Sequence, residues 1–157
     1  MIDDIMIMNG DETLYGINKY TGEIVWKRAD FKSGTGDGVL VTEGYNGRFF
    51  ASNILGGTRR TMELDPQTGA TKWLDVGNGG SAYPPLYFLN DVMYFISRGD
   101  GRIYAYDING GQLLWKLESP DHEGFMTMQV HQATGDQDQD MLVACSWKNA
   151  FRFEPAR

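Results

Sequence analysis

Three stretches of the chain share one spacing, in which an Asn or Asp is followed four residues later by Gly and eight residues later by Trp. The three copies are Asn18, Gly22 and Trp26, then Asp65, Gly69 and Trp73, then Asp107, Gly111 and Trp115. Successive copies begin 47 and 42 residues apart. A spacing kept three times indicates that the chain consists of copies of one structural unit.

Apolar residues alternate with a period of two just before each of these turns, and such alternation marks a half-buried strand. The alternating pairs are Tyr15 and Ile17, Met62 and Leu64, and Tyr104 and Tyr106. A fourth copy, "FRFEP", places Phe151 and Phe153 in the same way, with Glu154 where the other copies have Asn or Asp. This copy is not followed by the turn or the Trp.

The third unit shows all its strands. Alternating or apolar runs at 84–89, 92–97, 103–107 and 112–118 are joined by short segments rich in Gly, Asn and Asp. These residues tolerate the left-handed backbone of tight hairpins, so four antiparallel strands are expected. Four strands per repeat of about 40 to 45 residues are typical of a β-propeller blade.

The predicted fold is therefore an all-β propeller, or a portion of one, in a single domain over residues 1–157. The expected blades cover about 3–30, 38–76, 84–118 and 125–157, with three, four, four and three strands. The first blade lacks an inner strand and the last lacks an outer one.

Residues that recur in every blade are predicted to build blades rather than to carry out chemistry. A buried Trp removes roughly 150 to 250 Å² from water. A Trp at one fixed place in each outer strand can therefore fasten one blade to the next, while the Asn or Asp side chain bonds to turn amides.

This pattern resembles the tryptophan-docking motif of the PQQ-like (quinoprotein) β-propeller repeat family, roughly Ala-x-Asp-x-x-Thr-Gly-x-x-x-Trp. The matching residues are Asn18, Thr21, Gly22 and Trp26 in the first copy, Asp65, Thr68, Gly69 and Trp73 in the second, and Ala105, Asp107, Gly111 and Trp115 in the third. The first copy departs from the motif by having Asn for Asp, and the third has Gly110 in the place of Thr.

The resemblance implies the non-catalytic, BamB-like branch of the family, whose members are scaffolds for protein-protein interaction. Quinoprotein dehydrogenases of the same fold hold PQQ with calcium and use a vicinal disulfide. The single cysteine, Cys145, excludes that disulfide, and no residue is assigned to calcium or catalysis. We expect no cofactor, neither PQQ nor calcium. Two alternatives stay open: a fragment of a PQQ-dependent dehydrogenase, and a carbohydrate-binding or adhesion module, the latter suggested by the Arg98-Gly99-Asp100 triplet.

The formal net charge of −7 argues against nucleic acid as a partner, because nucleic-acid binding needs a basic surface. No apolar run approaches the roughly 18 residues of a membrane span, and the first ten residues lack the pattern of a secretion signal. The resemblance implies a periplasmic or outer-membrane-surface location, and a cytoplasmic one stays open.

One predicted face of the blades is basic. Loops between the second and third strands share that face with the connections between blades, and they are expected to carry Arg59, Arg60, Arg98, Arg102 and Lys148. Clustered Arg suits bidentate capture of carboxylates, so this face is a candidate site for an acidic partner or a carboxylate ligand. Ordinary scattered surface charge is the alternative interpretation.

Asp136, Asp138 and Asp140 alternate in the way that opens a calcium loop. Met141 and Trp147 occupy the places where such a loop needs Gly and Glu. This segment is therefore predicted to be a solvated hairpin tip, with a metal site as the weaker alternative.

The incomplete first and last blades leave three arrangements open: a four-bladed ring, two copies that close a larger propeller of about eight blades, or part of a longer protein. PQQ-like propellers generally have more than four blades, so the resemblance favours the second and third. A homodimer that completes the propeller is thus a candidate assembly.

Overall fold

The computed structural model describes residues 3–10, 13–30, 41–55, 58–74, 85–97, 99–134 and 139–156. Its regular elements in these ranges are β-strands, and among the described residues no helix is long and apolar enough to cross a membrane. The chain divides into two compact units, Met1–Ser81 and Ala82–Arg157.

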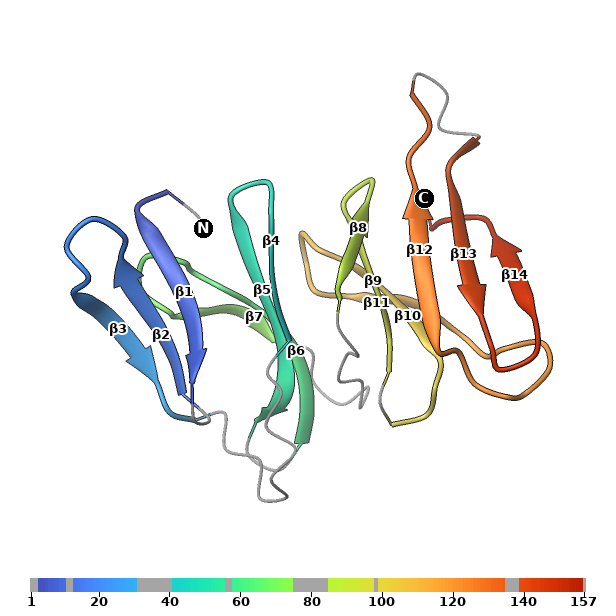
Figure 1. Ribbon diagram of the computed structural model, residues 1–157, viewed down its shortest axis with the longest axis horizontal. Helices are drawn as coiled ribbons and strands as arrows, with labels where there is room; N and C mark the ends of the chain where they lie inside the picture. The colour runs from blue at the N-terminus through green and yellow to red at the C-terminus, as the bar shows by residue number, and fades with distance from the viewer. Residues whose placement is uncertain are drawn as a thin grey trace. The chain divides into compact units, whose positions relative to one another are not determined.

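The first unit contains a three-stranded and a four-stranded sheet, both antiparallel and both in sequence order. The strands of the first sheet are β1 (Ile5–Gly10), β2 (Thr13–Asn18) and β3 (Ile24–Arg28). Those of the second are β4 (Val41–Tyr45), β5 (Arg48–Leu55), β6 (Thr58–Leu64) and β7 (Thr71–Leu74) (Figure 1).

The second unit has the same two kinds of sheet in the opposite order. Its four-stranded sheet consists of β8 (Tyr87–Leu89), β9 (Val92–Ile96), β10 (Ile103–Asp107) and β11 (Leu113–Leu117). Its three-stranded sheet consists of β12 (Thr127–His131), β13 (Met141–Cys145) and β14 (Ala150–Phe153). The predicted sequence of three, four, four and three strands is confirmed among the described residues.

Two of the connections are two-residue hairpin turns with left-handed backbone at both positions. Asn46 and Gly47 have φ of 49° and 74°, and Asn90 and Asp91 have 51° and 60°. This combination gives the type I′ turn, whose twist matches that of the flanking strands. Asn, Asp and Gly therefore occupy these two turns for the predicted reason, which is that they tolerate left-handed backbone.

One strand boundary differs from the expectation. The second hairpin of β4–β7 is tighter than predicted, because β5 runs to Leu55 and β6 starts at Thr58. Arg59 and Arg60 accordingly lie within strand β6 and pair with Ile54 and Asn53, instead of lying in a loop.

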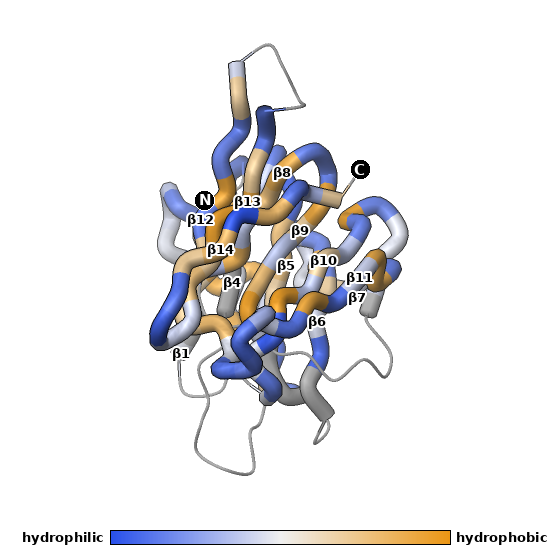
Figure 2. The backbone as a smooth tube through the Cα atoms, turned by 90° about the vertical axis from the view of Figure 1, so that its right-hand side faces the viewer, coloured by the Kyte–Doolittle hydropathy of each residue, from blue (hydrophilic) through white to orange (hydrophobic). Residues whose placement is uncertain are grey.

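The core of the first unit lies between its two sheets. Phe49, Ala51, Met62 and Leu64 project from one face of β5 and β6 and are buried. Leu14 and Trp26 from β1–β3 pack against them. Apolar residues lie mainly along the strands, and hydrophilic residues lie mainly in the turns (Figure 2).

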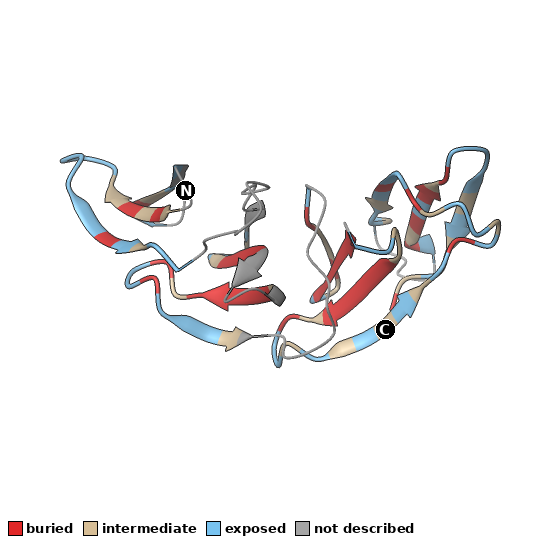
Figure 3. Cartoon of the chain, turned by 90° about the horizontal axis from the view of Figure 1, so that it is seen from below, coloured by how far each residue is buried: buried red, intermediate tan, exposed pale blue. Residues whose placement is uncertain are grey.

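In the second unit, one face of β9 and β10 packs against β12–β14. Phe125 meets Phe151 and Phe153 edge-on, with ring centroids 6.2 and 5.7 Å away. Near the end of the chain, the Ala156 amide donates to the Tyr94 hydroxyl at 2.9 Å. The central strands β9 and β10 are buried, whereas in the outermost strand β11 half-buried residues alternate with exposed ones (Figure 3).

The three outermost hairpins share a β-bulge. In each of them the register shifts so that one residue, directly before the Trp, has no partner on the neighbouring strand; these residues are Val25, Lys72 and Leu114. A bulge of this kind adds local twist and re-aims the following side chain.

Candidate interaction surfaces

The three motif turns are built alike. The Asn18 side-chain oxygen accepts from the amides of Tyr20 and Thr21, at 2.9 and 3.1 Å, and the Gly22 amide donates to the Asn18 carbonyl. Asp65 accepts from Gln67 and Thr68, and Asp107 from Asn109 and Gly110. The glycines have φ of 74°, 72° and 69°, a region that favours Gly. The predicted side-chain bonds to turn amides are thus present in all three turns.

Trp26 fastens β1–β3 to the motif turn of β4–β7. The indole lies over Gly69, where a Cβ atom would stand 2.6 Å from Trp26 Cε3, and Nε1 donates to the Pro66 carbonyl at 2.9 Å. On its other side the ring covers Gly16, whose Cβ would stand 2.2 Å from Trp26 Cε2. The site therefore requires glycine on both sides of the ring.

Arg28 adds a second contact to the same turn. Its Nη1 donates to the Gly69 carbonyl at 3.1 Å and to Thr71 Oγ1 at 2.8 Å. The sequence motif did not include this residue. An Arg two positions after the Trp was the available signal, and it occurs in one copy only.

Trp73 and Trp115 occupy the corresponding places on β7 and β11 and are half-buried. Trp73 packs on Phe50 with centroids 6.1 Å apart, and Trp115 packs on Tyr94 at 5.8 Å. Both rings thus contribute to the packing of their own sheets, in line with a structural role.

Asp121 joins the connection between β11 and β12 to the β13–β14 turn. It accepts from Ser119, from Ser146 Oγ at 2.6 Å and from Asn149 Nδ2 at 2.8 Å. The hydrogen bond from Ser119, with those from Ser146 and Asn149, holds the pKa of Asp121 well below its usual value of 3.8. Nothing in the repeat pattern indicated this residue, because the other copies have no counterpart.

The β13–β14 turn that Asp121 holds presents an exposed Trp. Trp147 is 73% exposed, and Met126, which stands beside the turn at the start of β12, is 50% exposed. The Met126 amide donates to the Cys145 carbonyl at 2.8 Å, which ties the two segments together. Lys148, the next residue of the turn, pairs with Glu123 at 2.5 Å.

Of the five basic residues predicted for a partner-binding face, Arg60 lies on β6 of the first unit, and Arg102 and Lys148 lie in the second unit. The side chain of Arg59 and the whole of Arg98 lie outside the described residues. Arg102 pairs with Asp100 and, at 2.8 Å, with Glu118. Because Lys148 is paired as well, this end of the second unit carries mixed charge, and a basic binding face stays a prediction.

Asp140 has a structural role, while Asp136 and Asp138 lie outside the described residues. Asp140 is buried and accepts from Asn90 Nδ2 and from the Ala133 amide, both at 2.7 Å. It thereby ties the β8–β9 turn to the β12–β13 hairpin. Placing it on a solvated tip was wrong, because its register position lies at the base of the hairpin.

Within the described ranges, no group of three or more His, Cys, Asp or Glu side chains could hold a metal ion. Of the two histidines, His122 pairs with Glu118 at 3.0 Å. Both histidines are exposed.

Solved propeller structures match the chain over nearly all its length. BamB from Moraxella catarrhalis has a TM-score of 0.59 and 19% identity, covering 93% of this chain and 43% of that one. The C-terminal WD40 domain of Sif2 has a TM-score of 0.67 and 13% identity, covering 97% and 40%. Quinohemoprotein alcohol dehydrogenase from Comamonas testosteroni has a TM-score of 0.61 and 15% identity, covering 97% and 34%. At these identities the matches establish the β-propeller fold, and the chain spans less than half of each protein.

No curated protein sequence matches the chain significantly. The profile of the family described as outer membrane protein assembly factor BamB matches residues 10–146. That match covers all three copies of the turn motif and most of each unit. The chain therefore belongs to this family of PQQ-like repeat β-propellers.

Proposed function

We propose that the chain is a non-enzymatic propeller scaffold that binds a protein partner through the β13–β14 turn, with Trp147 as the anchor. The observation that carries this proposal is an exposed Trp on a turn that is already fixed by hydrogen bonds to Asp121. The BamB-like fold supports a scaffold for protein interaction.

A protein partner fits the chemistry of this surface. Trp is among the residues that contribute most binding energy at protein interfaces, and Met is enriched there. The ion pair between Lys148 and Glu123 supplies a polar rim of both charges beside Trp147 and Met126. Because the turn is ordered before binding, less conformational entropy is lost when a partner docks.

We place the protein outside the cytoplasm, in the periplasm or at the outer-membrane surface, because the family is named for outer-membrane assembly. We propose that it works without PQQ, calcium or another cofactor. The turn carboxylates Asp65 and Asp107 are engaged with backbone amides, and Asp121 is engaged with side-chain donors.

Photocrosslinking tests this function. The full chain, carrying a photoreactive aromatic amino acid at Trp147, is irradiated in an extract of its own source organism. We expect one discrete protein adduct. The same amino acid at Leu114, an exposed apolar position on β11, is the control and should give none. The same adducts from both positions, or none from Trp147, would contradict the proposal.

An exposed Trp can also stack on sugars, so a glycan array is probed with the parent chain and with Trp147→Ala. We expect no glycan whose binding depends on Trp147. A Trp147-dependent sugar ligand would overturn the protein-scaffold function in favour of carbohydrate binding.

A further inference from the structure

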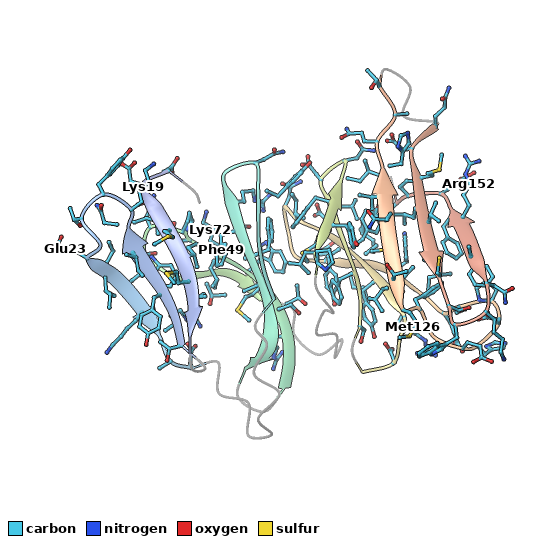
Figure 4. The ribbon with its side chains drawn as sticks, in the orientation of Figure 1. Lys19, Glu23, Phe49, Lys72, Met126 and Arg152 are labelled. Atoms are coloured by element: carbon cyan, nitrogen blue, oxygen red, sulfur yellow. The ribbon has the colours of Figure 1, made fainter. Side chains whose placement is uncertain are left out.

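Met126 is an exposed methionine beside the turn that carries Trp147. It is 50% exposed, and its amide donates at 2.8 Å to the carbonyl of Cys145, two residues before Trp147. Figure 4 labels Met126 at the end of β12 where the strand begins, and Figure 1 shows the β13–β14 turn at the same end of this sheet. A thioether therefore lies next to the surface proposed for the protein partner.

The backbone on both sides of Met126 is held in place. The Phe125 amide donates to the Gly101 carbonyl at 2.7 Å, and the Phe125 side chain is buried. Two residues after Met126, the side chain of Met128 is buried in the same core cluster. Because these contacts fix the chain, the Met126 side chain stays at the surface in the free protein, where dissolved molecules reach it.

The methionines of the chain differ in exposure. Met62, Met93 and Met128 are at most 1% exposed, whereas Met8 and Met126 are 48% and 50% exposed. A dissolved oxidant reacts with exposed thioethers before buried ones. Met8 belongs to β1 of the first unit, so it offers a thioether of nearly equal exposure on another sheet.

Oxidation would change the chemistry of this surface without changing its charge. The Met126 sulfur attacks one oxygen of hydrogen peroxide, an S–O bond forms, the O–O bond breaks, and the second oxygen leaves as water. The sulfur is oxidised to the sulfoxide and the peroxide is reduced. A flexible apolar side chain that packs well at an interface thereby becomes a polar one, whose oxygen must give up its water when a partner docks.

We propose that Met126 is a reversible oxidation site that controls docking of the protein partner at Trp147. Hydrogen peroxide converts Met126 to the sulfoxide and ends docking, and a methionine sulfoxide reductase with a dithiol reductant returns the thioether and restores docking. This inference rests on the proposed function, because it concerns regulation of the same surface.

The first measurement locates the oxidation. The full chain is treated with hydrogen peroxide, and peptide mass spectrometry follows each methionine. We expect Met126 and Met8 to be converted well before Met62, Met93 and Met128. The denaturant midpoint should stay unchanged, because an exposed thioether contributes little to the core. Conversion of Met8 without Met126, or loss of the fold when Met126 is converted, would overturn the proposal.

The second measurement follows docking. The chain with the photoreactive amino acid at Trp147 is treated with peroxide, freed of peroxide and then irradiated in the extract of its source organism. We expect the adduct yield to fall about tenfold and to recover after incubation with the reductase. In Met126→Leu, which has no thioether there, treated and untreated samples should give equal yields. A fall that persists in Met126→Leu would assign the effect to another group, such as the Cys145 thiol, and overturn the proposal.

A polar side chain at the same position gives an independent test without an oxidant. Met126→Gln should reproduce the low adduct yield of the oxidised chain, because Gln is of similar length and polar. Met8→Gln is the matched control and should keep the yield of the parent. Equal yields from Met126→Gln and the parent would contradict the proposal.

The two levels of the proposal fail in different ways. No adduct from the untreated parent would refute docking at Trp147, and the regulation would fall with it. An adduct whose yield is the same before and after full conversion of Met126 would overturn the regulation alone and leave the proposed function in place.

Discussion

The Asp65–Gly69 turn (the covered turn) and the Asn18–Gly22 turn (the open turn) have the same hydrogen bonds and the same glycine conformation, yet within the described part of the chain only the covered turn lies beneath an indole and an arginine. The conformation of the turn is therefore set by its own residues and does not require the neighbouring sheet. Burial of the adjacent face, in contrast, depends on that neighbour. The geometry of the turn and the burial of its sheet therefore have different causes.

The largest loss of stability should come from removing the Trp26 ring that covers the Asp65–Gly69 turn. Trp26→Ala removes the ring that fills the space between Gly16 and Gly69, and we expect a loss of about 3–5 kcal/mol in the stability of the first unit. Hydrogen exchange of β2 and β6 under increasing denaturant measures it. Trp147→Ala, which removes an exposed ring, should change stability by less than about 0.5 kcal/mol. A similar cost for both would mean that the docking of Trp26 contributes little.

The second largest effect should come from adding a side chain at the glycine of each turn, and the loss of stability should differ between the two turns. Gly69→Asn places an atom against the Trp26 ring and should cost about 1–3 kcal/mol, since the ring or the turn must move. Gly22→Asn finds free space and should cost less than about 1 kcal/mol. Denaturant melts of the two variants, with the parent, give the comparison. Equal losses would show that the left-handed backbone, rather than the indole, dictates glycine.

The two turns should lose the same amount of stability when the side chain that accepts from their amides is removed. Asn18→Ala and Asp65→Ala each delete two hydrogen bonds from a side chain to turn amides, and we expect each to cost about 1 kcal/mol. The measurement is again the denaturant midpoint. A cost confined to Asp65→Ala would contradict the independence of the hairpin.

The smallest expected effect is the pH dependence of the stability that Asp65 contributes to its turn. Partial burial acts to raise the pKa of Asp65, but hydrogen bonds from the Gln67 and Thr68 amides outweigh it and hold that pKa below 3.8. The ionised side chain therefore contributes stability that is present above pH 3.8 and is lost as the pH falls through the lowered pKa. Asp65→Asn should abolish this dependence, so the stability difference from the parent should shrink in acid. Asn18 does not titrate, so Asn18→Ala should show no such change.

Much of the fold could be predicted from the sequence because it rests on local rules. The alternation at Tyr104 and Tyr106 and the turn residues at Asn90 and Asp91 each act within a few neighbours, and the strand count follows from them. The docking of Trp26 was predictable because the motif repeats. The residue that departs from the motif shows the limit: Glu63 holds the place of Ala105, and its burial depends on Arg48 and Lys72, which the motif does not contain.

The candidate site was less predictable because its residues are not repeated. Asp121, Ser146 and Asn149 come together only when two distant connections meet. The ion pairs of the predicted basic residues were also not predictable from the sequence. Pairing of Arg102 with Glu118 and of Lys148 with Glu123 is set by contacts across the fold, which a count of charged residues does not reveal.

The bulge before each Trp has a consequence for how such repeats tolerate length changes. Along a regular strand, side chains alternate like even and odd numbers, and the extra residue at Val25, Lys72 or Leu114 resets that parity just before the indole. Deleting one of these residues would leave composition and charge nearly unchanged and yet send the indole to the opposite side of its sheet. In this repeat, the number of residues between Asp and Trp is more constrained than the identity of the residues that fill the interval.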